Sequence, residues 1–474
     1  MPTKANPLRQ KQFHQFGQRV SSLSDRISPP GVLAEGRLAL LSGMRLEVEG
    51  LKAGIGARCR IDSEEPGGVD AEVVGFNGER LVLMVEGTAE GLQPGAVVRQ
   101  IAGSGRVPVG HELLGRVIDG AGQPLDGLSD NLGAFTVPMR GGYLNPMARA
   151  AIREPIDVGI RAINSLLTIG EGQRLGLFAG SGVGKSTLLG MMTRFTNADV
   201  VVVGLVGERG REVREFVEDS LGPEGLRKSV VVATPADTSP LMRVAGAWRA
   251  TAIAEYYRAQ GMRVLLLMDS LTRFAQAQRE IGLAAGEPPV SKGYTPSVFS
   301  LLPNLIERAG NYGGGSITAI YTVLTENDDL QDPIADAARA ILDGHVVLSR
   351  ELAESGVFPA IDIESSVSRA MLQITDKDQQ REARLVKEAY ATYRANRDLI
   401  AIGAYRQGSD PKIDIAIQHQ DAIRRLIEQP IDESADFQSS VAALAEMTAA
   451  MQVSRAVDAG SQQSGSGTLM PIQR

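Results

Sequence analysis

Residues 174–187 read RLGLFAGSGVGKST, and this stretch decides the fold. An apolar run leads directly into a glycine-rich turn that ends at Lys185. Gly180, Gly182 and Gly184 have no Cβ, so the backbone N–H groups of the turn can come close to phosphate oxygens and surround them. The stretch therefore predicts a phosphate-binding loop (P-loop) between a buried strand and a helix.

Two side chains at the end of this loop extend the prediction. Lys185 can reach the β- and γ-phosphates of a nucleotide, and the hydroxyl of Ser186 can ligate Mg²⁺. A helix expected over 187–195 would direct its positive N-terminal end at the phosphates. The strict pattern has glycine where this chain has Ala179, the smallest replacement, and an ordinary glycine turn is the alternative interpretation. The residues expected to hold the nucleotide are Gly180, Ser181, Gly182, Val183, Gly184, Lys185, Ser186 and Thr187.

Two further apolar runs end in carboxylates. Residues 263–270, RVLLLMDS, predict a buried parallel strand ending at Asp269, which can hold Mg²⁺ through the water shell of the ion. Residues 199–212, DVVVVGLVGERGRE, predict a second such strand that ends near Glu208 and Arg209. Because the carboxyl ends of parallel strands face the ligand, we expect Glu208 to polarise a water molecule beside the γ-phosphate. The alternative is a surface ion pair between Glu208 and Arg209.

Composition limits the class of protein. The chain has 474 residues, enough for roughly two to four domains, and 43% of them are hydrophobic. No apolar run is long enough to span a membrane, and no apolar segment typical of a secretion signal opens the chain. The only cysteine, Cys59, cannot form an intrachain disulfide, so we expect a cytoplasmic protein. The net charge of −7 gives no bulk attraction to nucleic acid or anionic lipid.

Changes in sequence pattern divide the chain into successive parts. Residues 1–25 form a basic arm, and short alternating runs over 26–102 predict a small β-barrel. Apolar strands alternate with helical stretches over 103–375, which predicts an α/β P-loop NTPase core with a mostly parallel, doubly wound sheet. The pattern over 376–438 predicts a C-terminal helical domain, with a capping box of Thr375 and Asp378 at its start. Within residues 439–474, an alanine-rich helix is expected over 439–457 and a disordered tail over 460–474.

The same motifs occur in the same order in the catalytic subunits of rotary ATP synthases. The P-loop, the two strands that end in carboxylates and PAIDIESSVS at 359–368 resemble that superfamily, which implies a RecA-like core, and the likeness covers roughly residues 25–440. The segments 269–289 and 293–310 are more specific and resemble the type III export ATPases, which energise flagellar assembly and, in a sister branch, virulence injectisomes. IGAYRQGSD at 402–410 is closer to the flagellar branch. The resemblance implies an ATPase for flagellar protein export, with an injectisome ATPase as the alternative.

The resemblance also assigns catalytic roles. Glu208 matches the carboxylate that activates the attacking water, and Arg209 is its neighbour. Asp269 matches the acid of the magnesium-binding strand, and Arg273 matches an arginine near the γ-phosphate. Arg369 matches the arginine finger, which in this superfamily enters the site of the neighbouring subunit; a surface or helix-capping arginine is the alternative. The implied catalytic residues are Lys185, Glu208, Arg209, Asp269, Arg273 and Arg369.

Two aromatic residues match the adenine pocket of the superfamily. Phe358 matches an aromatic residue that stacks on adenine, where many relatives have tyrosine. Phe437 lies at a matching distance after Gln429 and Pro430 and is expected to cover the other face of the base. For Phe358 the alternative is core packing.

The implied ligands are ATP and Mg²⁺, and the implied assembly is a homo-oligomeric ring, expected to be a hexamer. The resemblance places this ring in the cytoplasm at the inner membrane face of the export apparatus. Its implied partners are a stator-like regulatory protein at the basic arm 1–25, the membrane export gate and chaperone–substrate complexes.

Two other classes of protein share the core. An RNA-translocating hexamer reads single strands with aromatic platforms in a basic groove, but the predicted barrel has one aromatic residue, Phe76, and more acids than bases. We therefore expect no specific nucleic acid. A rotary synthase subunit or a non-catalytic homologue is the other class, and the presence of Lys185, Glu208 and Asp269 argues against a non-catalytic chain.

Overall fold

The computed structural model describes residues 35–64, 67–101, 105–129, 132–142, 144–325 and 332–464, with side chains described as far as Val453. The chain divides into two compact units between Ser104 and Gly105. The predicted basic arm, residues 1–25, lies outside the described residues.

The first unit is a closed antiparallel barrel with the strand order β1-β2-β5-β4-β3-β6. Alternate side chains point inward, and Leu46, Cys59 and Leu83 are fully buried in its core. This confirms the predicted β-barrel. Its strands are β1 (Glu35–Ser42), β2 (Arg45–Glu49), β3 (Arg58–Ile61), β4 (Val69–Asn77), β5 (Arg80–Val85) and β6 (Val97–Gln100).

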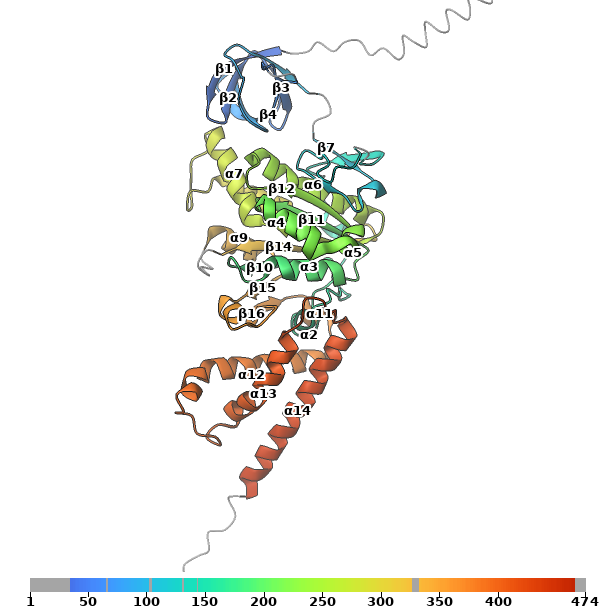
Figure 1. The fold of residues 1–474 in the computed structure, drawn as a ribbon, viewed down its shortest axis with the longest axis vertical. Coiled ribbons are helices and arrows are strands. Elements are labelled where there is room, and N and C mark those ends of the chain that lie inside the picture. The colour runs from blue at the N-terminus through green and yellow to red at the C-terminus, as the bar shows by residue number, and fades with distance from the viewer. Residues whose placement is uncertain are drawn as a thin grey trace, which may run out of the picture. The chain divides into compact units, whose positions relative to one another are not determined.

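The second unit is built on an eight-stranded sheet with the order β16-β15-β10-β14-β13-β11-β12-β8. Neighbouring strands are parallel except for β15 and β16, which run antiparallel at one edge. The central strands are continuous apolar runs because helices cover them, and this confirms the predicted α/β core (Figure 1). The strands are β8 (Val117–Ile118), β10 (Arg174–Ala179), β11 (Val200–Val206), β12 (Ser229–Thr234), β13 (Arg263–Asp269), β14 (Ser316–Leu324), β15 (Gly344–Leu348) and β16 (Ile361–Ser368), and a separate ribbon pairs β7 (Arg106–Val109) with β9 (Phe135–Pro138).

The helices of the core follow the strands in the alternating order expected of an α/β fold. The longest, α6, packs against β11, β12 and β13. No helix in the described ranges is both long enough and apolar enough to cross a bilayer. The core helices are α2 (Arg161–Leu166), α3 (Lys185–Phe195), α4 (Gly210–Glu215), α5 (Gly222–Arg227), α6 (Pro240–Ala259), α7 (Leu271–Ala285), α8 (Pro296–Ile306), α9 (Pro333–Ile341), α10 (Arg350–Glu354) and α11 (Met371–Ile374).

Three further helices form the predicted C-terminal helical part: α12 (Lys377–Ala401), α13 (Pro411–Ile427) and α14 (Phe437–Ser464). They pack against one another at the end of the chain (Figure 1). The predicted capping box is wrong, because the N-cap of α12 is Asp376, whose carboxylate accepts the N–H of Gln379 at 2.7 Å.

The last helix differs from its predicted extent at both ends. It begins at Phe437 rather than at Ser439, because the Asp436 carboxylate accepts the N–H of Ser439 and caps the first turn. The helix then continues to Ser464, so residues 460–464, expected to be disordered tail, are helical. The remaining tail lies outside the described residues.

Candidate nucleotide-binding site

Three of the predicted site residues meet at the carboxyl edge of the sheet. Lys185, the first residue of α3, lies with its Nζ 2.6 Å from Asp269 Oδ1 and 3.1 Å from Glu208 Oε1. Asp269 ends β13, and Glu208 follows β11, the strand beside β13. Because β10, β14, β13 and β11 are consecutive parallel strands, their carboxyl ends bring these groups together. Glu208 therefore faces the P-loop rather than forming a surface ion pair with Arg209.

The loop backbone has the conformation that the glycines permit. Gly182 and Gly184 have φ values of 79° and 86°, in the left-handed region that other residues rarely occupy. Gly184 is the N-cap of α3, so the helix begins at the point where the loop ends. Ser186 and Thr187 occupy the first turn of this helix, and Ser186 is exposed. The loop therefore presents a helix N-terminus, as an anion site requires.

The charges at this edge are held in a nearly buried setting. Burial lowers the pKa of Lys185, but the attraction of the Asp269 and Glu208 carboxylates outweighs it, and the net shift is upward. The Thr322 hydroxyl, from β14, donates to Asp269 Oδ1 at 2.6 Å and fixes that carboxylate. Lys185 is therefore a charged ammonium group held between two carboxylates.

A cavity of about 630 Å³ adjoins the loop at Ser181. Its lining is rich in cations, a setting that suits phosphate groups. Arg273, on α7, contributes to the lining, and its Nη1 donates to Gln276 at 2.9 Å. The cationic lining residues are Arg273, Arg279, Lys292 and Arg350.

Arg209 is not brought to the P-loop in this structure. It is the N-cap of α4, its side chain is 84% exposed, and its guanidinium lies 3.5 Å from Glu212. Arg209 is therefore the neighbour of Glu208 in the sequence, but its side chain points to solvent.

The two predicted adenine-pocket residues are held in different ways. Phe358 is 46% exposed, and its ring lies against Gly184, where a Cβ would come 3.4 Å from Phe358 Cδ1. Its carbonyl accepts the backbone N–H of Gln429 at 2.9 Å. Phe437 is half-buried at the start of α14, and its N–H donates to Asp157 Oδ2 at 2.9 Å. The structure thus places Phe358 at the P-loop, while Phe437 is fixed through its backbone.

Arg369 lies at the edge of the sheet where the parallel strands begin, whereas the P-loop lies at the edge where they end. Ser368, the last residue of β16, pairs with Gly344, the first residue of β15, and β15 runs parallel to β10. Arg369 is therefore near the start of β10, whereas the P-loop follows its end. At about 3.3 Å per residue, this strand separates them by roughly 20 Å, more than an arginine side chain can reach. Its guanidinium is exposed and makes no hydrogen bond or ion pair to any residue that the structure describes.

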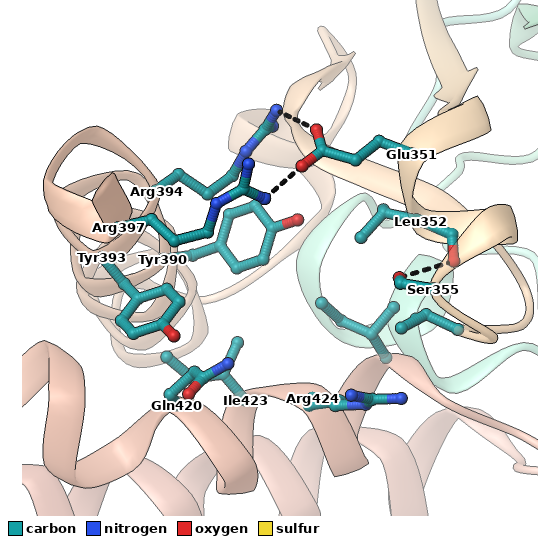
Figure 2. Close-up of a pocket in the computed structure, with 12 residues that line it drawn as sticks. Glu351, Leu352, Ser355, Tyr390, Tyr393, Arg394, Arg397, Gln420, Ile423 and Arg424 are labelled. Carbon is teal, nitrogen blue, oxygen red and sulfur yellow. Dashed lines mark hydrogen bonds and ion pairs between the residues drawn. The ribbon is translucent and has the colours of Figure 1, made fainter. Parts of the chain in front are cut away.

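A second cavity, of about 210 Å³, lies where the core meets the C-terminal helices (Figure 2). Glu351, on α10, bridges Arg394 and Arg397 of α12 above an apolar floor. Val357, also in the lining, directly precedes Phe358. This cavity could not be predicted from the sequence, because its lining comes from residues far apart in the chain and no motif marks it.

Comparison with known proteins gives two family matches. The model of the ATP synthase alpha/beta family nucleotide-binding domain matches residues 159–368. The model of the T3SS EscN ATPase C-terminal domain matches residues 375–446. Among curated proteins, the flagellum-specific ATP synthase of Pseudomonas aeruginosa is 56% identical over 443 residues, which cover 92% of this chain and 98% of that relative.

Solved structures agree with these matches. The assembled ATPase EscN from the type III secretion system of enteropathogenic E. coli has a TM-score of 0.83 at 44% identity, covering 87% of this chain and 99% of the EscN chain. EscN in complex with its central stalk EscO has a TM-score of 0.80 at 43% identity, with the same coverage.

Proposed function

This chain belongs to the flagellum-specific ATP synthases, the type III export branch of the ATP synthase alpha/beta family, and from that premise we propose how its residues hydrolyse ATP. It is an ATPase that energises type III protein export. The observation that carries the proposed site is the meeting of Lys185 with Glu208 and Asp269 at the P-loop. The flagellar branch is favoured over an injectisome because the flagellar relative is the more similar one.

The P-loop would bind the phosphates of ATP. The left-handed glycines and the start of α3 fit a phosphate group, and the Lys185 ammonium would neutralise its charge. Ser186 and Asp269 would hold Mg²⁺, the latter through water, since both supply the oxygen ligands that this ion prefers. When bound, Mg²⁺ supplies positive charge to the β- and γ-phosphate oxygens. The full set proposed to cradle the phosphates is Gly180, Ser181, Gly182, Val183, Gly184, Lys185, Ser186 and Thr187.

Glu208 would orient the attacking water. Its carboxylate lies 3.1 Å from Lys185 Nζ. Phosphate bound to Lys185 would displace this carboxylate, which would then be free to hold a water molecule beside the γ-phosphate. Arg273, in the wall of the cation-rich cavity, would contribute positive charge near the γ-phosphate. Arg209 would support Glu208 only after its exposed side chain turns inward.

Phe358 would stack on the adenine base. Its exposed ring beside Gly184 is free to receive a planar group, and base–aromatic stacking contributes roughly 1–3 kcal/mol per base. Phe437 would cover the other face of the base.

Arg369 would complete the site of a neighbouring subunit. Its distance from the P-loop of its own chain and its exposed, unpaired guanidinium both favour action in trans. Assembly into a homo-oligomeric ring, which we propose to be a hexamer, would then be the activity switch. The solved structure of the assembled EscN supports an oligomer of this kind.

The proposed setting is the cytoplasmic face of the inner membrane at the export apparatus. Residues 1–25 would bind a stator-like regulatory protein, and the ring would act on the export gate and on chaperone–substrate complexes. The solved complex of EscN with its central stalk EscO supports the binding of a further protein to an assembled ATPase of this kind. No specific nucleic acid is proposed as a partner.

The direct test is phosphate release from ATP by the purified chain and by Lys185→Ala. We expect hydrolysis to fall below detection and ATP binding to weaken, while circular dichroism shows an intact fold, because the substitution removes a charge at the carboxyl edge of the sheet and leaves the apolar core unchanged. Normal turnover by this variant would overturn the assignment of the P-loop.

A further inference from the structure

The backbone around Arg369 is held tightly although its side chain is exposed. We propose that Asp343 is the positioning residue for Arg369, and that it acts on the active site of the neighbouring subunit. The carbonyl of Asp343 accepts the backbone N–H of Arg369 at 3.0 Å. This inference rests on the proposed function, in which Arg369 is the finger.

Asp343 is in turn fixed to Arg174, the first residue of β10. Its backbone N–H donates to the Arg174 carbonyl at 2.8 Å, and its Oδ2 accepts the backbone N–H of Arg174 at 3.1 Å. The two side chains add a bidentate pair, with Arg174 Nε 2.9 Å from Oδ2 and Nη2 3.1 Å from Oδ1. Paired bonds of this kind fix direction as well as distance. We call this set of four hydrogen bonds the Asp343–Arg174 clasp.

The residues that precede Arg369, and the start of the paired strand β15, are also fixed. Gly344 has a φ of 150°, and a Cβ there would lie 2.4 Å from the Val367 carbonyl oxygen, so this close approach requires glycine. Gln173 Nε2 donates to the Asp343 carbonyl at 3.0 Å and to Ser368 Oγ at 3.1 Å. A finger that reaches into another subunit needs such a rigid base, because misplacement by about 1 Å can cost 10²-fold in rate.

The chain contains a matched control at the same edge of the same sheet. Asp199 N–H donates to the Arg263 carbonyl at 2.9 Å, and Asp199 Oδ2 accepts the Arg263 N–H at 2.8 Å. Arg263 Nη2 lies 3.0 Å from Asp199 Oδ1. This second clasp joins β11 to β13 as the first joins β15 to β10, but it holds no residue with a proposed role in a neighbouring site. Comparison of the two clasps separates finger placement from sheet stability.

The experiment is a mixing assay with Asp343→Asn, in which the side chain keeps its size and loses its charge. We expect this variant to fold and to bind a fluorescent ATP analogue as the unmodified chain does, with kcat about 10- to 100-fold lower. Asp199→Asn should keep kcat within about twofold of the unmodified chain. Rings mixed from Asp343→Asn and Lys185→Ala subunits should regain activity, because an intact P-loop then meets a well-placed finger. Rings mixed from Asp343→Asn and Arg369→Ala should not.

Three outcomes would overturn the inference. The first is a normal kcat for Asp343→Asn, and the second is an equal loss of kcat in Asp343→Asn and Asp199→Asn. The third is that Lys185→Ala subunits restore activity to Arg369→Ala but not to Asp343→Asn. Failure of the Arg369→Ala and Lys185→Ala pair would instead contradict the finger itself, and the inference would fall with it. If Asp343→Asn does not fold, Arg174→Lys removes the bidentate pair from the other side and takes the same mixing assay, with the same expected rescue.

Discussion

The eight-stranded sheet has a carboxyl edge, where its parallel strands end, and an amino edge, where they begin. These two edges present their charged residues in opposite ways. At the carboxyl edge, Lys185, Glu208 and Asp269 converge within 3.1 Å contacts and are mostly buried. At the amino edge, Arg369 is held only through its backbone and its guanidinium points to solvent. Under the proposed function, the first edge binds the nucleotide within one chain, whereas the second acts on the site of another subunit. The comparison therefore leads to the proposal that the catalytic unit is an interface between subunits.

The largest expected effect at the amino edge comes from Arg369→Ala. We expect kcat of assembled rings to fall by about 10³- to 10⁵-fold, the usual contribution of an arginine finger. Nucleotide affinity of the isolated subunit should not change, because Arg369 lies far from its own P-loop. Steady-state hydrolysis and equilibrium titration with a fluorescent nucleotide measure the two quantities. A loss of nucleotide affinity as large as the loss of kcat would indicate that Arg369 acts on its own P-loop, contrary to the proposed difference between the edges.

At the carboxyl edge, Glu208→Gln should lower kcat by about 10²- to 10⁴-fold, the range for general acid–base groups. Binding should persist, because Lys185 keeps Asp269 as a partner at 2.6 Å. Single-turnover hydrolysis and nucleotide titration test this. If affinity and rate decline together, Glu208 is a structural partner of Lys185 and another group positions the water.

Phe358→Leu should have a smaller effect, on KM rather than kcat. Loss of base stacking costs roughly 1–3 kcal/mol, which raises KM for ATP while the phosphate contacts remain. Phe135→Leu is the matched control, since Phe135 is an exposed phenylalanine of β9 with no proposed contact to nucleotide. An unchanged KM for Phe358→Leu would assign this ring to packing.

Much of the carboxyl edge could be predicted from the sequence. The P-loop is a local motif, and parallel strands bring Glu208 and Asp269 to one edge whatever the details of packing. The hydrogen bond from Thr322 to Asp269 could not be predicted, because it joins residues 53 positions apart through an ordinary β-strand threonine.

Much less of the amino edge could be predicted from the sequence. The role of Arg369 came from family resemblance, and nothing local in the sequence pairs Asp343 with Arg174, which lies 169 positions away. The barrel and the helical part could be predicted from periodicity. The start of α14 could not, because it depends on the Asp436 cap, and a cap affects only the first turn of a helix.

The smallest expected effect on turnover comes from deletion of residues 2–20. ATP hydrolysis by preassembled rings should stay near the level of the full chain, since both edges of the sheet are intact. Capture of the regulatory protein in a pull-down should be lost, because the deletion removes the cations of the arm. Full-strength capture by the truncated chain would place the docking site elsewhere.

The central claim is that one chain supplies the P-loop and the next supplies the finger. It is tested most directly by mixing Arg369→Ala with Lys185→Ala subunits under conditions that form mixed rings. Each variant alone should be inactive, and the mixture should recover part of the activity, because an intact P-loop then meets an intact Arg369 at some interfaces. No recovery in rings shown to contain both variants would contradict the claim and indicate a site complete within one chain.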